Sequence, residues 1–258
     1  MNTKKYKKYR IIIISMMVIL ALLFQGCGKQ KTKVSVRVVV IDTGISTNAI
    51  SKEHIGEGKN YVDTNLSTED TYGHGTAVAS IILKEAKNTQ IVPLVSNVFE
   101  NGKIKQVDND TLAQMIRDAV DIYHCRIINL SAGLVLDKES VRQAVEYAEK
   151  KNVLIIASAG NDYAENGAVR YYPAAYESVL AVGALNQDGT EIAAFSQRGE
   201  WVDVYTVGEQ VEIKTLSGNT GVGDGTSYSA AKVTGQAVLE IENDAEITVD
   251  ELKKILSN

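Results

Sequence analysis

The chain has 258 residues, of which 45% are hydrophobic and 23% charged, so it can bury a sizeable core and is not disordered over its whole length. This length is typical of one large domain with a short additional segment. The net charge is -5 at neutral pH, and the only dense basic cluster lies within residues 4–10. We therefore expect no nucleic-acid partner, because binding to phosphates requires clustered basic side chains.

Residues 1–27 are typical of an export signal. The basic stretch is followed by residues 11–24, which carry no charge and are fewer than the roughly 20 residues that a membrane-spanning helix needs. A positive flank stays in the cytoplasm, so the rest of the chain should be exported. Gly26 and Cys27 resemble the end of a bacterial lipoprotein signal, which would lipidate Cys27 and hold the chain at the outer face of the membrane. A signal anchor and an ordinary secreted protein are the alternatives.

After a short linker at 28–35 we expect one domain at 36–258. Continuous apolar runs, typical of parallel strands buried on both faces, occupy residues 36–41, 91–95, 127–130, 153–157 and 179–182. Helical stretches lie between them at 74–86, 111–123 and 138–151. Strand-like segments at 193–195 and 202–207, a glycine-rich stretch at 216–225, and helices from 227 to about 241 and at 249–256 complete the chain. This alternation predicts an α/β fold with a mainly parallel sheet and helices on both faces.

Three polar residues stand at the ends of these elements. Asp42 ends the first strand, His74 begins a helix between two glycines, and Ser227 begins another helix. The carboxyl ends of parallel strands and the helices that follow them meet at one edge of the sheet, so these residues can converge. A serine becomes a nucleophile when a histidine accepts its proton, and a carboxylate holds that histidine in the required tautomer. Singly, each residue would be read as a turn, helix-start or capping residue.

The same segments, in the order Asp, His, Ser, resemble the subtilisin (subtilase) family of serine proteases. Two further segments agree. Residues 157–162 resemble the family segment that carries the oxyanion-hole asparagine, here Asn161, which would act with the backbone N–H of Ser227. Residues 128–133 resemble the strand that binds extended substrate. The resemblance covers about residues 36–258 and implies a three-layer fold and a serine endopeptidase that acts on peptides or proteins without a cofactor or metal.

The resemblance also assigns a set of substrate-binding residues, which are Ser131, Ala132, Gly133, Ala159, Gly160, Asp162 and Tyr171. Two of them predict opposite specificities. Tyr171 would lie near the base of the pocket for the residue at the cleaved bond, and would favour a small side chain. Asp162 at the rim would favour a basic one, because opposite charges attract, or it could be a solvated loop carboxylate.

Other features depart from the family pattern. Only about six residues separate Cys27 from the first strand, so we expect no pro-domain. The domain should then fold unaided or with a helper in trans. We also expect a dedicated role, such as the removal of a leader from a secreted peptide. The loop at 84–90 lacks the carboxylate cluster that binds calcium in many relatives, so no calcium requirement is expected there. Tyr228 stands where the family commonly has methionine, and its bulk bears on the rate and on the leaving-group side.

The remaining histidines and cysteine have no catalytic context. His54 and His124 are expected to be structural or solvent-facing, and Cys125 to be a small buried residue. With Cys27 lipidated, the domain has no disulfide. A catalytically inactive surface-binding protein is the alternative function, and the complete set of Asp42, His74, Ser227 and Asn161 argues against it. A nucleotide-binding α/β protein is disfavoured because an acid, Asp42, follows the first strand where phosphate-binding N–H groups would be needed.

Overall fold

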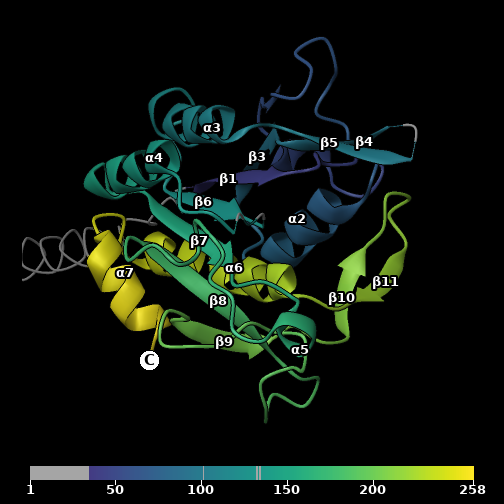
Figure 1. The fold of residues 1–258 in the computed structure, drawn as a ribbon. Helices are drawn as coiled ribbons and strands as arrows, with labels where there is room; N and C mark the ends of the chain where they lie inside the picture. The colour runs from purple at the N-terminus through teal and green to yellow at the C-terminus, as the bar shows by residue number, and fades with distance from the viewer. Residues whose placement is uncertain (1–34, 101, 132, 134) are drawn as a thin grey trace, which may run out of the picture. The chain divides into compact units, whose positions relative to one another are not determined.

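The structure is a computed structural model that describes residues 35–258, apart from 101, 132 and 134 (Figure 1). The predicted signal peptide, most of the linker and the lipidation of Cys27 lie outside the described residues, as does Ala132. Within the described ranges, no helix is both long and apolar enough to cross a membrane.

A seven-stranded sheet forms the centre of the described domain, in the order β2-β3-β1-β6-β7-β8-β9, with every neighbouring pair parallel. Its strands are β1 (Arg37–Asp42), β2 (Lys59–Asn60), β3 (Gln90–Val95), β6 (Ile127–Leu130), β7 (Leu154–Ser158), β8 (Val179–Leu185) and β9 (Val204–Val207). Apolar side chains on both faces of β1 are buried, as a parallel strand covered on two sides requires. The strands predicted at 36–41, 91–95, 127–130, 153–157, 179–182 and 202–207 are confirmed, apart from shifts of a few residues at their ends.

Helices cover the two faces of this sheet. Alternate side chains of a strand point to opposite faces, and those of β1 divide accordingly. Val38 and Val40 pack with α2 (His74–Glu85), α6 (Thr226–Asn243) and α7 (Val249–Leu256). Val39 and Ile41 pack with α3 (Asn109–Asp121) and α4 (Glu139–Lys150) on the other side. Figure 1 shows α2 and α6 on one side and α3 and α4 on the other. The predicted α/β fold with helices on both faces is confirmed.

Smaller elements lie outside these layers. They are the short helices η1 (Lys52–His54) and α5 (Tyr163–Asn166), and two antiparallel hairpins, β4–β5 (Asn97–Glu100 and Lys103–Gln106) and β10–β11 (Val211–Lys214 and Thr220–Gly223). One sequence prediction is wrong here. Residues 193–195 form turns beside a single bridge between Leu185 and Ile192, not a strand. The glycine-rich stretch at 216–225 contains β11, because the backbone pairing with β10 does not need apolar side chains.

Candidate active site

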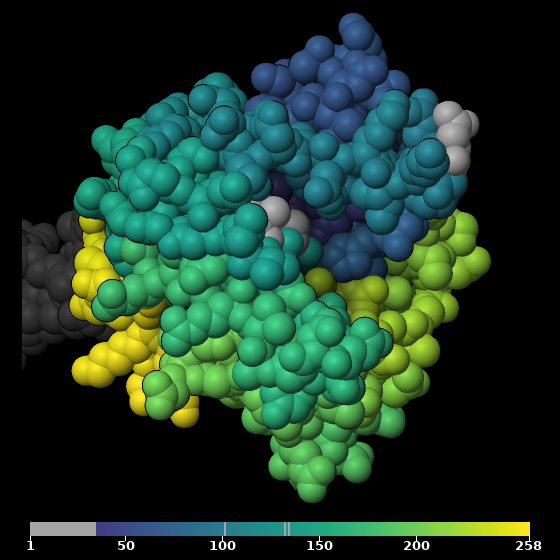
Figure 2. Space-filling view, viewed as in Figure 1, coloured from purple at the N-terminus to yellow at the C-terminus, as the bar shows by residue number. Residues whose placement is uncertain are grey.

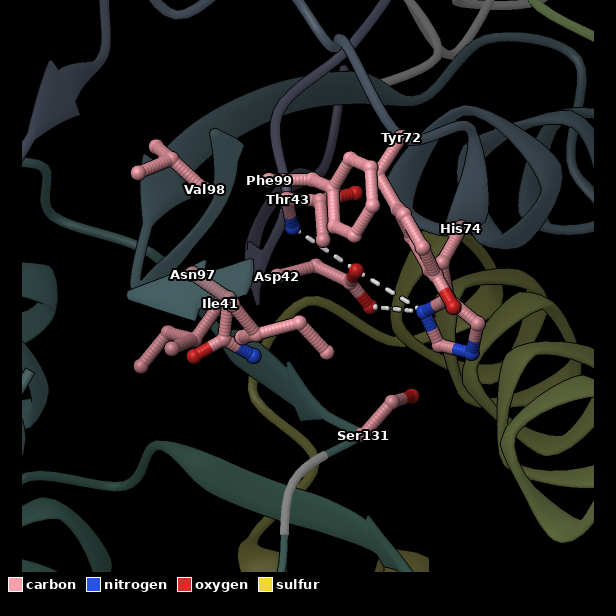
Figure 3. Close-up of a pocket in the computed structure, with 10 residues that line it drawn as sticks. Ile41, Asp42, Thr43, Tyr72, His74, Asn97, Val98, Phe99 and Ser131 are labelled. Carbon is pink, nitrogen blue, oxygen red and sulfur yellow. Dashed lines mark hydrogen bonds and ion pairs between the residues drawn. The ribbon is translucent and has the colours of Figure 1, made fainter. Parts of the chain in front are cut away.

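Asp42 and His74 form a hydrogen-bonded pair at the carboxyl edge of the sheet. Asp42 is the last residue of β1 and His74 is the first of α2. His74 Nδ1 lies 2.8 and 2.9 Å from the two carboxylate oxygens of Asp42 (Figure 3). The backbone N–H of Thr43 donates to the same carboxylate over 2.7 Å. Because Nδ1 faces Asp42, the other ring nitrogen is the one available to a reacting group.

Small residues allow α2 to approach β1 this closely. A β-carbon at Gly75 would lie only 2.3 Å from the carbonyl oxygen of Gly44 and 3.2 Å from the β-carbon of Asp42. The backbone N–H of Gly75 also donates to Thr43 Oγ1 over 2.9 Å. The glycine after His74 is therefore what lets the helix start against the end of the strand, and it places the imidazole on Asp42.

A second buried carboxylate, Asp70, organises the turn that precedes His74. One of its oxygens accepts from the backbone N–H groups of Tyr72 and Gly73, and the other accepts from the N–H and hydroxyl of Thr76, all within 2.7–2.9 Å. It is only 4% exposed. Sequence analysis missed this residue, and the available signal was an acid a few positions ahead of a helix that starts with Gly-His-Gly. Such carboxylates pair with the free N–H groups of a first helical turn.

The electrostatic setting raises the pKa of His74 above its usual 6.5. The negative charge of Asp42 is the main cause, and it outweighs burial, which alone would lower the pKa. The hydrogen bond to Asp42 and the charge of Asp70 add to the increase. The imidazolium form is thus stabilised at this position.

Asn161 is fixed by the residue that precedes Ser227. Its side-chain oxygen accepts from both the backbone N–H and the hydroxyl of Thr226, each over 2.8 Å. The amide nitrogen takes no part in these two hydrogen bonds. A β-carbon built on Gly225 would lie 3.6 Å from that nitrogen and 3.8 Å from the backbone nitrogen of Ser227. Two N–H donors thus border the same small space beside Gly225.

Ser227 lies in the first turn of α6, one residue after the helix begins, and Gly225 rather than Ser227 is the N-cap. Its neighbour Tyr228 stacks on the His74 ring, with ring centroids 5.9 Å apart and an interplanar angle of 30°. Ser227 is therefore flanked by one residue that binds Asn161 and another that contacts His74. Tyr228 also lies against β11, where a β-carbon at Gly223 would come within 2.6 Å of its ring.

An open pocket of about 180 Å³ lies beside the Asp42–His74 pair. One wall comes from the β4–β5 hairpin, whose Phe99 and Ile104 are 44% and 58% exposed. The Tyr72 ring lies 5.7 Å from that of Phe99, and Ser131 closes the pocket below His74 (Figure 3). In the space-filling view, purple atoms from the first described residues are visible at the bottom of a hollow on this face (Figure 2). On the other side of His74, Tyr72, Tyr228 and residues 213–217 line a wider groove of about 570 Å³.

The other predicted substrate-binding residues gather at the ends of β6 and β7. Tyr171 lies against both Gly133 and Gly160, and its hydroxyl donates to Asp162 over 2.5 Å. Ala159 is fully buried. Ser131 faces the open pocket and donates to Asn129 over 3.3 Å.

Residues predicted to lie outside the site do so. Cys125 is buried, and this burial raises the pKa of its thiol to about 12. His124 is exposed and has a positive φ of 48°, and His54 lies 3.3 Å from the carbonyl oxygen of Thr89. Across the described ranges there is no group of three or more acidic, histidine or cysteine side chains that could hold a metal ion. The expected independence from calcium stays a prediction.

The structure is an α/β fold with the Asp42–His74 pair, a candidate active site, at the carboxyl edge of its parallel sheet. A model of the subtilase family matches residues 33–258, and the chain belongs to this family. The thermophilic serine proteinase of Bacillus sp. (strain AK1) is 34% identical over 211 residues, 78% of this chain and 51% of that protein. Subtilisin BL of Lederbergia lenta is 35% identical over 212 residues, 79% of this chain and 75% of that protein.

Solved structures agree with this membership. A cold adapted subtilisin-like serine proteinase superposes with a TM-score of 0.75 and 25% identity, over 86% of this chain and 81% of that one. A lanthipeptide protease has the same fold, with a TM-score of 0.75 and 24% identity over 86% of this chain and 79% of that one. The chain spans about half the length of the first sequence relative. The relationships support serine endopeptidase activity.

Proposed function

We propose that this chain is a serine endopeptidase in which Asp42, His74 and Ser227 form the catalytic triad. The observation that carries the proposal is the contact of His74 Nδ1 with both oxygens of the buried Asp42 carboxylate. That contact leaves the second ring nitrogen to act on a nucleophile, and Tyr228, the chain neighbour of Ser227, stacks on the His74 ring. Membership in the subtilase family supports the same assignment.

The proposed reaction follows from these positions. The Ser227 hydroxyl attacks the peptide carbonyl while His74 takes its proton, and the Asp42 carboxylate stabilises the imidazolium that forms. The carbonyl oxygen becomes negative and accepts hydrogen bonds from the Asn161 amide and the Ser227 N–H. His74 returns the proton to the leaving amine, which gives an acyl-enzyme. Water, activated by His74, then releases the acid and restores Ser227.

The assignment is tested by incubating the full chain, purified in detergent, with a peptide library and identifying the cleaved bonds. The Ser227→Ala variant is the matched control, because it removes only the hydroxyl. We expect its turnover to fall on the order of 10⁶-fold, since the nucleophile cannot be replaced by its neighbours. Cleavage at the same bonds that persists in the variant would show that another residue, or a contaminating protease, is responsible.

The proposed location is the outer face of the cell membrane, with Cys27 lipidated. The sequence of residues 1–27 supports this, and so does export of a relative, the minor extracellular protease Epr of Bacillus subtilis (strain 168), which is 30% identical over 228 residues, 85% of this chain and 35% of that protein. Expression in a bacterial host should place the chain in the membrane fraction, and Cys27→Ser should release it or leave its precursor unprocessed. An unchanged mass and distribution after Cys27→Ser would contradict lipidation and favour the signal anchor. Removal of a leader from a secreted peptide stays a prediction.

A further inference from the structure

The Tyr171 ring occupies the space between the ends of two neighbouring strands. β6 and β7 pair in parallel, and Gly133 and Gly160 follow their carboxyl ends. A β-carbon at Gly160 would lie 2.7 Å from Cδ2 of Tyr171, and one at Gly133 would lie 3.2 Å from its Cδ1. Both glycines therefore face the ring, and the ring is held between the two backbones.

Polar contacts keep the ring in this place. The Tyr171 hydroxyl donates to Asp162, and the same carboxylate accepts from Asn166 and Gln197 over 2.7 and 2.8 Å. The hydrogen bond to Asp162 raises the pKa of Tyr171 to about 12, so the hydroxyl stays a donor at any ordinary pH. At the other end, the Tyr171 carbonyl accepts from the N–H of Ala175 over 2.8 Å. Asp162 is thus engaged by three groups of its own chain.

This filled space lies next to the donors that would bind the reacting carbonyl. Gly160 directly precedes Asn161, whose amide nitrogen borders the same space as the Ser227 N–H. A carbonyl oxygen that accepts from both donors must lie within about 3 Å of them. The side chain of the substrate residue that owns this carbonyl begins two bonds away. That side chain can therefore reach the space between Gly160 and Gly133, where Tyr171 already lies.

We propose that Tyr171 closes the pocket for the residue on the acyl side of the cleaved bond, so that the enzyme cleaves after small residues such as glycine, alanine and serine. This inference rests on the proposed function and names its substrate class. A large apolar side chain has no room between the two glycines. A basic side chain meets a carboxylate, Asp162, that already accepts from Tyr171, Asn166 and Gln197.

The test compares peptides that differ only in the residue on the acyl side of the cleaved bond, with alanine, leucine, phenylalanine or arginine there. For the full chain we expect kcat/KM to be at least about 10-fold higher for alanine than for phenylalanine, since one misfit in an apolar pocket is worth about 10–200-fold. Tyr171→Gly should open the pocket and raise the phenylalanine-to-alanine ratio by a similar factor. Tyr171→Phe keeps the ring but loses the bond to Asp162, so its preference for small residues should remain.

Two results would overturn the inference. One is an unmodified enzyme that cuts after phenylalanine or arginine as readily as after alanine, and the other is a folded Tyr171→Gly variant with an unchanged ratio. If Tyr171→Gly does not fold, the profile of the unmodified enzyme and of Tyr171→Phe still decides the matter. A fluorophosphonate probe separates this inference from the proposed function. Labelling of Ser227 together with cleavage only after large residues would refute this inference alone. The absence of both labelling and cleavage would refute the proposed function.

Discussion

Two regions flank Ser131 at the carboxyl edge of the sheet, and they differ in what fills them. Toward His74 lies an open pocket of about 180 Å³, whose apolar wall is provided by the β4–β5 hairpin. Toward Asn161 lies the space between Gly133 and Gly160, which the Tyr171 ring occupies. The wall of the open pocket is formed by a hairpin outside the core. The ring that fills the other space belongs to a loop whose Tyr171 hydroxyl donates to Asp162.

The difference suggests where this enzyme gains its selectivity. Alternate side chains of an extended peptide point in opposite directions. If the residue on the acyl side of the cleaved bond faces Tyr171, the residue before it faces His74 and the open pocket. A small residue would then be tolerated at the cleaved bond, while an apolar side chain one position earlier would gain contacts with Tyr72, Phe99 and Ile104. Binding energy would come mainly from the open pocket beside His74.

The larger of two expected effects comes from removing the apolar wall of the open pocket. Phe99 pairs with Ile104 across the hairpin and contacts Tyr72, so Phe99→Ser removes the centre of that wall. We expect kcat/KM to fall about 10-fold for peptides with leucine one position before the residue at the cleaved bond, and to change little for those with glycine there. Steady-state kinetics on the two peptides measures this.

The matched control is Val222→Ser, which removes an exposed apolar side chain from the other hairpin, β10–β11. It should leave both peptides unaffected. An equal loss for the leucine and glycine peptides in Phe99→Ser would mean that the hairpin supports His74 rather than the substrate. Melting curves of both variants should stay close to that of the unmodified chain, because Phe99 is 44% exposed and Val222 62% exposed.

The sequence predicted the sheet, the main helices and the elements that carry Asp42, His74 and Ser227, because buried parallel strands are continuous apolar runs and the helices alternate with them. It did not predict the β4–β5 hairpin. Every residue of β5 is exposed, and the half-buried residues of β4 are consecutive. Neither strand therefore shows the alternation of buried and exposed side chains that is typical of a strand with one covered face. The open pocket was therefore not predicted, although Asp42, His74 and Ser131 on its border were identified.

Specificity could be predicted only as a conflict between Tyr171 and Asp162. The structure adds a hydrogen bond between these two residues, which depends on the path of the loop that brings residues nine positions apart into contact. Local sequence patterns do not encode such a path. Asp70 was missed for a similar reason, since its four hydrogen bonds appear only when the turn before His74 is folded.

The smaller expected effect concerns the turn that carries both Tyr72, a wall of the open pocket, and His74. The charge of Asp70 helps to raise the pKa of His74, and a protonated His74 cannot accept the proton of Ser227. The acid limb of kcat/KM should therefore lie above pH 6.5 in the unmodified enzyme. Asp70→Asn removes the charge with little change in size, so the limb should move to lower pH, though only in part, because Asp42 remains the main cause.

The pH dependence separates this charge effect from a merely structural one. Asp70→Asn leaves only one acceptor oxygen for the four donors that Asp70 binds, and this loss can loosen the turn. Loosening of the turn alone would lower kcat at every pH without moving the acid limb. Glu69→Gln is the matched control, since this neighbouring carboxylate binds Thr47 and is not among the causes of the His74 shift. A limb that moves equally in both variants would point to a general change in surface charge. A limb that moves only in Asp70→Asn would show that the buried carboxylate acts on His74 itself.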